Sequence, residues 1–249
     1  MPAGQQALTI PVPGHGGVSA VLHRPKPFER GVTPGLLLAH GAGSDMDAPL
    51  LLAVAESLAL AGILVLRFNF PYTDAGRRAP DRADVLLGTL RAAADCLRSG
   101  TSWTPGRVYL GGKSMGGRIA SHLAAQGYPC DGLVFLGYPL HPAGRPDRAG
   151  ERAAHLPRIA APMLFIQGSR DALCDLALLR PLIEPLGRRA RIHVIEEGDH
   201  SFEVPKRLNR RREEVWDEVV AQVRSFILGG VPRDGARPAA GASKRGADH

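Results

Sequence analysis

A single serine stands between two glycines in the stretch Gly112-Lys113-Ser114-Met115-Gly116. The apolar run 107–110 before it predicts a buried strand, and the run 118–125 after it predicts a helix. A serine in so sharp a turn needs small neighbours, because strand and helix approach each other closely there. The turn would lift the hydroxyl above a sheet edge, beside the first N–H groups of the helix. The alternative is a glycine-rich turn that only packs.

Short apolar runs alternate with amphipathic segments along the whole chain. Two runs near the start flank a glycine-rich turn and predict an antiparallel pair. The later runs are continuously apolar, as expected for parallel strands covered on both faces. The alternation predicts an α/β fold with a doubly wound, mostly parallel sheet flanked by helices. The expected strands lie at 8–10, 18–22, 35–39, 63–68, 107–110, 133–137, 163–167 and 191–195, and the expected helices at 47–62, 86–97, 118–125 and 215–227.

One apolar segment, residues 48–66, contains Glu56 as its one charged residue and could be taken for a membrane span. Pro49 opens it and Gly62 interrupts it, which favours a helix followed by a buried strand. We expect Asp47 to cap that helix through its carboxylate. The N-terminal residues lack both a basic region and an apolar run, so no signal peptide is expected.

The composition fits a globular protein of ordinary domain size. Of the 249 residues, 44% are hydrophobic and 22% are charged. We expect one domain over residues 1–230 and a disordered tail over 231–249, since the tail has no large apolar residue after Val231. Three cysteines at no metal-like spacing favour a cytoplasmic location without disulfides or a bound metal.

The net charge of +7 raises the possibility of a nucleic-acid partner. The excess is mostly arginine in a chain that is also rich in Ala, Gly and Pro, which a GC-rich coding sequence would also produce. The arginines within 207–212 precede an amphipathic helix and fit a solvated helix start. No nucleic-acid-binding motif accompanies them. We therefore expect neither a nucleic-acid nor a membrane partner, and the sequence leaves the oligomeric state open.

Two further residues complete a possible catalytic triad with Ser114. A serine hydroxyl becomes nucleophilic when a neighbouring base takes its proton and a third group orients that base. His200 follows the last predicted strand and is the candidate base, and Asp171 follows the preceding strand and is the candidate orienting group. All three lie at the carboxyl ends of predicted parallel strands, where such sheets place their sites. Asp171 could instead cap a helix beginning near Ala172.

The candidate oxyanion hole consists of two backbone N–H groups. One belongs to Met115, directly after the nucleophile, and the other to Ala42 in the stretch His40-Gly41-Ala42-Gly43 after a predicted strand. His40 itself is expected to have a structural role. Asp199 is a poor orienting group, because its side chain should point away from that of its neighbour His200.

By these motifs the chain resembles the α/β-hydrolase superfamily from about Val18 to Leu228. The stretches 40–47, 67–72, 111–118 and 198–202 resemble its dienelactone-hydrolase-like branch and, more narrowly, the Tex30/KANSL3-like hydrolases. The resemblance implies the α/β-hydrolase fold and a serine hydrolase of undefined substrate. Dienelactone hydrolases proper have a cysteine at the elbow, so Ser114 argues against dienelactone as the substrate.

These observations predict a cofactor-free serine esterase or thioesterase that forms an acyl-enzyme intermediate with a small-molecule substrate. An alternative is a hydrolase fold kept as a protein-interaction module with little or no catalysis. The connection 138–148 is too short and polar for a lipase-like lid, so we expect no large lid domain and an open site. Tyr72, Arg77 and Arg78 follow a strand end near the expected site and are candidate substrate-binding residues, and the two arginines could favour an anionic substrate.

Overall fold

A single eight-stranded sheet forms the centre of the computed structural model, which describes residues 4–229. The tail predicted at 231–249 lies outside these residues. The strand order is β1-β2-β4-β3-β5-β6-β7-β8, with antiparallel β1–β2 and β2–β4 pairs and parallel pairs from β4 to β8. This confirms the predicted mostly parallel sheet. The strands are β1 (Gly4–Val12), β2 (Gly16–Arg24), β3 (Pro34–Ala39), β4 (Leu64–Phe68), β5 (Arg107–Lys113), β6 (Gly132–Leu136), β7 (Met163–Gly168) and β8 (Ala190–Ile195).

Helices connect the parallel strands and cover both faces of the sheet. The α-helices are α1 (Pro49–Leu60), α2 (Pro71–Asp74), α3 (Ala83–Ser99), α4 (Met115–Ala125), α5 (Ala149–Ala153), α6 (Leu176–Ile183) and α7 (Arg212–Gly229). Within the described residues, four short 3-10 helices lie in the loops: η1 (Pro146–Arg148), η2 (Leu156–Arg158), η3 (Glu184–Arg189) and η4 (Lys206–Leu208).

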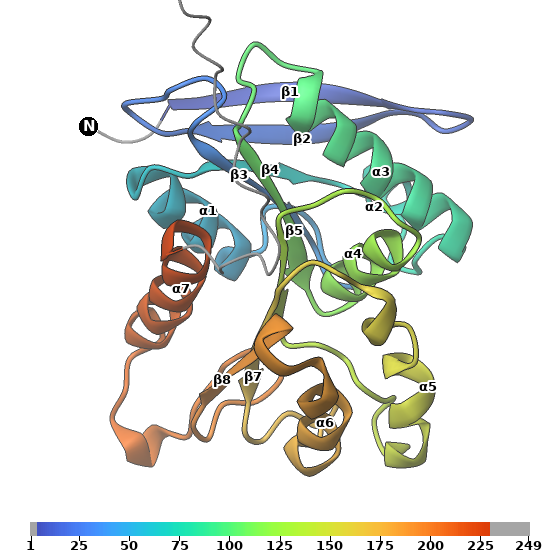
Figure 1. The fold of residues 1–249 in the computed structure, drawn as a ribbon, viewed down its shortest axis with the longest axis vertical. Coiled ribbons are helices and arrows are strands. Elements are labelled where there is room, and N and C mark those ends of the chain that lie inside the picture. The colour runs from blue at the N-terminus through green and yellow to red at the C-terminus, as the bar shows by residue number, and fades with distance from the viewer. Residues whose placement is uncertain (1–3, 230–249) are drawn as a thin grey trace, which may run out of the picture.

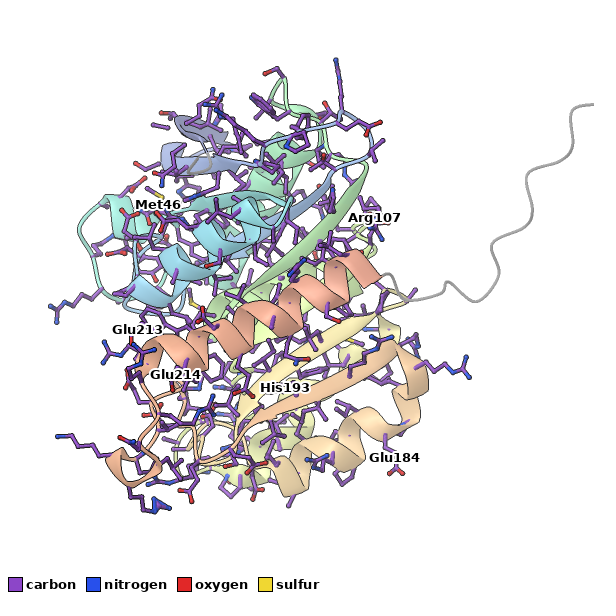
Figure 2. The ribbon with its side chains drawn as sticks, turned by 90° about the vertical axis from the view of Figure 1, so that its left-hand side faces the viewer. Met46, Arg107, Glu184, His193, Glu213 and Glu214 are labelled. Carbon is purple, nitrogen blue, oxygen red and sulfur yellow. The ribbon has the colours of Figure 1, made fainter. Side chains whose placement is uncertain are left out.

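The core has two halves, one on each face of the sheet. Buried residues of α3, α4, α5 and α6 pack on one face, and those of α1 and α7 pack on the other. Figure 1 shows the two sets of helices on opposite sides of the strands. Figure 2 looks onto the α1 and α7 side, where α7 runs across the sheet beside α1. The strands β3, β6 and β7 are buried along their whole length, which explains their mostly apolar sequences.

The parallel strands end at one common edge of the sheet. The loop after β3, the turn after β5, and the loops after β6, β7 and β8 all begin there, because parallel neighbours keep their register. Each predicted triad residue follows one of these strand ends. The topology therefore brings segments from distant parts of the sequence to one edge.

Of the two predictions about local structure near α1, one is confirmed and one is wrong. The apolar segment 48–66 forms α1 and β4, as predicted. The expected cap of α1 is wrong, since Ala48 is the N-cap and no side chain caps the helix. The Asp47 carboxylate instead pairs with buried Arg67 at 2.9 Å. No helix within residues 4–229 has the length and apolar character needed to cross a bilayer.

The connection between β6 and β7 contains no large lid domain. It holds η1, α5 and η2, none of them longer than five residues. This agrees with the expectation from its polar, proline-rich sequence.

Candidate active site

The turn after β5 places Ser114 in an unusual backbone conformation. Its φ of 51° and ψ of −115° lie outside the regions that residues with a Cβ normally occupy. A Cβ on Gly112 would collide with the Ala39 carbonyl oxygen, and a Cβ on Gly116 would collide with the carbonyl oxygens of Ala39 and His40. The two glycines are therefore required by the close approach of β3, β5 and α4. The Ser114 N–H donates to the Leu136 carbonyl at 3.1 Å, which holds the turn against β6.

The structure brings Ser114, His200 and Asp171 together. His200 Nε2 lies 2.9 Å from Ser114 Oγ, and His200 Nδ1 lies 2.7 Å from Asp171 Oδ2. An ionised carboxylate can only accept, so Nδ1 carries the hydrogen and Nε2 is free to accept the serine proton. The Asp171 side chain is fully buried, whereas the His200 side chain is 23% exposed. The His200 imidazole is thus partly accessible from outside, while the Asp171 carboxylate is shielded from water.

The Asp171 carboxylate accepts further hydrogen bonds besides the one from His200. Its Oδ1 accepts a hydrogen bond from the Leu173 N–H at 2.8 Å, and its Oδ2 also accepts one from Gln167 Nε2 at 2.5 Å. Gln167 is fully buried on β7, and its Oε1 accepts from the Tyr138 N–H at 2.8 Å. The helix that follows, α6, is capped by Asp175 and not by Asp171. The carboxylate is therefore fixed by a side chain that the sequence analysis did not single out.

The Asp199 side chain forms hydrogen bonds within its own loop. Its Oδ1 accepts hydrogen bonds from the backbone N–H groups of Ser201 and Glu203, at 2.7 and 2.9 Å. This is the local side-chain-to-backbone bonding typical of aspartate in turns. Asp199 therefore shapes the loop that carries His200 and does not contact the imidazole.

The loop after β3 lies against the nucleophile turn. A Cβ on Gly41 would lie 3.6 Å from both Ser114 Cβ and the Lys113 carbonyl oxygen. His40 is fully buried, with Nδ1 at 2.8 Å from the Gly41 carbonyl oxygen and Nε2 accepting from the Phe70 N–H at 3.1 Å. Burial lowers the pKa of His40 and keeps the ring neutral. His40 thus has a structural role in this loop.

The two candidate oxyanion-hole residues lie on either side of Ser114. Met115 is the first residue of α4, so its N–H is one of the unpaired donors at a helix start. Ala42 lies in the loop against the turn, and among the described residues its N–H donates to no protein acceptor.

A pocket of about 500 Å³ opens beside Ser114 and His200. This volume is within the range of small-molecule sites. Its wall is mainly apolar on the α1 and α7 side, where Leu50, Leu51 and Trp216 contribute side chains. Polar side chains also line it, among them Lys113 and Arg212.

Two charged residues of the pocket wall have defined surroundings. Arg212 pairs with Glu203 at 2.8 Å and lies 5.8 Å from the ring centre of Trp216. Burial lowers the pKa of Lys113 to about 8, against the opposing effect of the Asp171 and Asp199 carboxylates. Neither Trp216 nor Arg212 was singled out from the sequence as a site residue, because a residue on a helix stripe or in a charged helix start gives no signal of what it faces.

The candidate substrate-binding residues are not among those that line this pocket. Tyr72 is fully buried, and its hydroxyl donates to the Gly41 carbonyl at 3.3 Å. Tyr72 therefore stabilises the loop after β3 from the protein interior. Arg77 is exposed and pairs with Asp81 at 2.6 Å. The Arg78 side chain is exposed, and its backbone runs beside Gly43. The structure thus brings the triad and the oxyanion loop together but leaves these three residues outside the pocket.

Comparisons with known proteins agree with this architecture. The family model for the alpha/beta hydrolase domain matches residues 33–228. A dienelactone hydrolase from Anabaena variabilis is 25% identical, with a TM-score of 0.72 over 93% of this chain and 100% of that one. A serine hydrolase without a lid from Xanthomonas campestris is 23% identical, with a TM-score of 0.68 over 93% and 99%. An esterase from Pyrococcus furiosus is 17% identical, with a TM-score of 0.68 over 90% and 91%.

The family match covers most of the chain and includes every element that carries the candidate site. The two less similar structures share the fold. The chain belongs to the alpha/beta hydrolase domain family.

Proposed function

We propose that the protein is a serine hydrolase that cleaves an ester or thioester of a small substrate. The observation that carries this proposal is the chain of hydrogen bonds from Ser114 through His200 to buried Asp171, at 2.9 and 2.7 Å. Such a chain is the arrangement that turns a hydroxyl into a nucleophile. The pocket beside it is large enough for a small ester.

The reaction would proceed in two halves. Ser114 Oγ attacks the carbonyl carbon while His200 Nε2 takes the hydroxyl proton, and the N–H groups of Met115 and Ala42 stabilise the developing oxyanion. His200 then gives the proton to the leaving alcohol or thiol, and the acyl group remains on Ser114. In the second half His200 takes a proton from water as the water attacks the acyl-enzyme. His200 then gives that proton to Ser114 Oγ as the bond from Oγ to the acyl carbon breaks, which releases the acid and restores the free serine.

We also propose a cellular location and a narrower family for the protein. The three free cysteines support a cytoplasmic location. A closer kinship to the Tex30/KANSL3-like hydrolases remains a prediction from the motifs.

A fluorophosphonate probe tests the proposal directly, because it reacts with activated serines. The wild-type protein should be labelled at Ser114, the Ser114→Ala variant should not be labelled, and the control Ser99→Ala, on the exposed end of α3, should be labelled like wild type. A panel of esters and acyl thioesters, assayed with the same three proteins, then defines the leaving group. Absence of labelling and of turnover in the folded wild-type protein would favour the interaction-module alternative.

A further inference from the structure

The carbonyl oxygen of Gly41, in the loop after β3, lies within hydrogen-bond distance of three donors. They are His40 Nδ1 at 2.8 Å, the Tyr72 hydroxyl at 3.3 Å and the Ser44 N–H at 3.3 Å. The bond from Ser44 closes a tight turn over residues 41–44, so the two side chains are additional to what the turn requires. Both side chains are fully buried, and the oxygen is therefore directed into the protein interior.

The protonation of the two side chains makes both of them donors. The Phe70 N–H can only donate, so His40 Nε2 accepts from it, at 3.1 Å. Burial lowers the pKa of His40, so the ring is neutral and its single N–H hydrogen is on Nδ1, facing the Gly41 carbonyl. Burial raises the pKa of Tyr72, so the phenol keeps its proton.

The same peptide unit carries the candidate oxyanion donor. The Gly41 carbonyl and the Ala42 N–H belong to one trans peptide, so they point in opposite directions. Because the oxygen is directed toward buried side chains, the N–H is directed away from them. Ala42 is exposed, and it lines the pocket together with Gly41 and Ser114. The hydrogen bonds to the oxygen therefore determine which way the N–H faces.

The segment that follows β4 supplies part of this support. Besides the bond from Tyr72 to Gly41, the Thr73 hydroxyl donates to the Ser44 carbonyl at 3.3 Å, three residues further along the same loop. The stretch 67–72 is one of those that carry the family resemblance, and the steps of the proposed reaction give it no role. Its contacts point to a role in placing the loop.

We propose that Tyr72, together with His40, is a positioning residue that holds the Gly41–Ala42 peptide with its N–H toward the substrate carbonyl. The inference rests on the proposed function, in which the Ala42 N–H stabilises the oxyanion. Two donors on the carbonyl oxygen fix the peptide plane before the oxyanion forms. They also polarise the peptide, which strengthens its N–H as a donor.

Tyr72→Phe tests the proposal, because it removes the hydroxyl and keeps the ring that packs against His40, with ring centres 5.7 Å apart. We expect kcat to fall about tenfold with KM unchanged, since the peptide acts on the oxyanion and not on the bound substrate. A trifluoromethyl ketone that forms a tetrahedral adduct with Ser114 should bind about tenfold more weakly. An unchanged kcat, or a loss confined to KM, would overturn the proposal.

Tyr128→Phe is the matched control. Tyr128 is buried, its hydroxyl donates to Asp95 at 2.7 Å, and it follows the end of α4 that is far from Ser114. This variant also loses a hydrogen bond from a buried phenol, but it should keep the wild-type kcat and affinity for the ketone. An equal loss of kcat in both variants would show a general effect of lost hydrogen bonding and would overturn the role of Tyr72.

A measurement that needs no turnover separates this proposal from the proposed function. In the ¹H–¹⁵N spectrum of the Ser114→Ala protein, Tyr72→Phe should move the Ala42 amide proton upfield, because the peptide is less polarised and the ring is still present. Tyr128→Phe should leave that resonance in place. An unmoved Ala42 resonance in Tyr72→Phe would overturn the proposal. If the wild-type protein hydrolyses no ester, a moved resonance still supports the hold of Tyr72 on the peptide, and the failure counts against the hydrolase alone.

Discussion

Gln167 and His200 donate hydrogen bonds to the same oxygen of Asp171, at 2.5 and 2.7 Å. Because Gln167 is fully buried and also bonded to the Tyr138 N–H, it fixes the carboxylate in one orientation. Gln167→Met keeps the volume and removes the donor. We expect kcat to fall about 10- to 100-fold, the scale of a small misplacement of a catalytic group, with KM little changed.

Steady-state kinetics on a reactive ester checks this expectation. Gln126→Met serves as the control, since Gln126 is exposed at the end of α4. An unchanged kcat in Gln167→Met would show that Asp171 is held well enough by the Leu173 N–H and His200.

Removal of the nucleophile or the base should abolish most of the turnover. We expect Ser114→Ala and His200→Ala each to lower kcat by a factor on the order of 10⁴ to 10⁶. The double variant should be no slower than either single one, because the two residues act as a unit and the residual rate comes from the oxyanion donors and binding. Additive losses in the double variant would contradict a shared mechanism. Circular dichroism should show that all three variants are folded.

Gly137 lies beside His200, the proposed base. A Cβ at this position would be 3.1 Å from Lys113 Nζ and 3.2 Å from the His200 carbonyl oxygen, and its φ is +70°. We expect Gly137→Ala to lower the free energy of unfolding by about 1 kcal/mol or more and to lower kcat by displacing His200.

Gly144 provides a matched control for this substitution. Its φ is +69°, but a Cβ there would meet open space. Gly144→Ala should therefore show a similar loss of stability in urea denaturation with an unchanged kcat. Equal kcat values for the two variants would mean that the Gly137 contact does not affect the base.

Buried histidines predict a loss of stability in acid. Burial, followed by the charges of His122, Arg118 and Arg158, lowers the pKa of His155 to about 3. Below pH ~6.5 the unfolded chain takes up a proton that the folded His155 does not, so the free energy of unfolding falls by up to about 1.4 kcal/mol per pH unit until the folded pKa is reached. Between pH 6.5 and 4.5, His155→Gln should lose about 2–3 kcal/mol less than wild type.

Urea denaturation at the two pH values measures this difference. His15→Gln is the control, because His15 is exposed in the turn between β1 and β2. An acid loss in His155→Gln as large as in wild type would show that this histidine is not kept neutral by the fold.

The sheet and the position of Ser114 could be predicted because their signals are local. The strands are marked by continuous apolar runs bounded by glycine and proline, and the turn by the spacing of Gly112 and Gly116 around the serine. The proposed cap at Asp47 failed for the opposite reason. A local preference for capping was overridden by a tertiary partner, buried Arg67, which the sequence around Asp47 does not reveal.

The other residues of the site could not be recognised from the sequence, because their part in it depends on which way each side chain faces. Gln167 stands at the end of an apolar strand and was not predicted as a site residue. A single polar residue in such an apolar run is a signal that could have indicated a buried hydrogen-bonding role. Trp216 lies in the helix predicted at 215–227, and nothing in the apolar pattern of that helix indicates that this side chain borders a pocket. Tyr72 follows a strand end near the site, but its hydroxyl lies under the loop at Gly41. A position just after a strand end thus predicts that a residue lies near the site, but it does not predict where its side chain points.

The backbone of Ser114 has an evolutionary consequence. A φ of 51° with ψ of −115° costs free energy for any residue with a Cβ, on the order of 1–3 kcal/mol, and glycine removes most of that cost. Ser114→Gly should therefore make the chain more stable while destroying its nucleophile. Selection for stability alone would replace this serine by glycine, so its retention in a lineage of related chains would itself be a record of selection for chemistry.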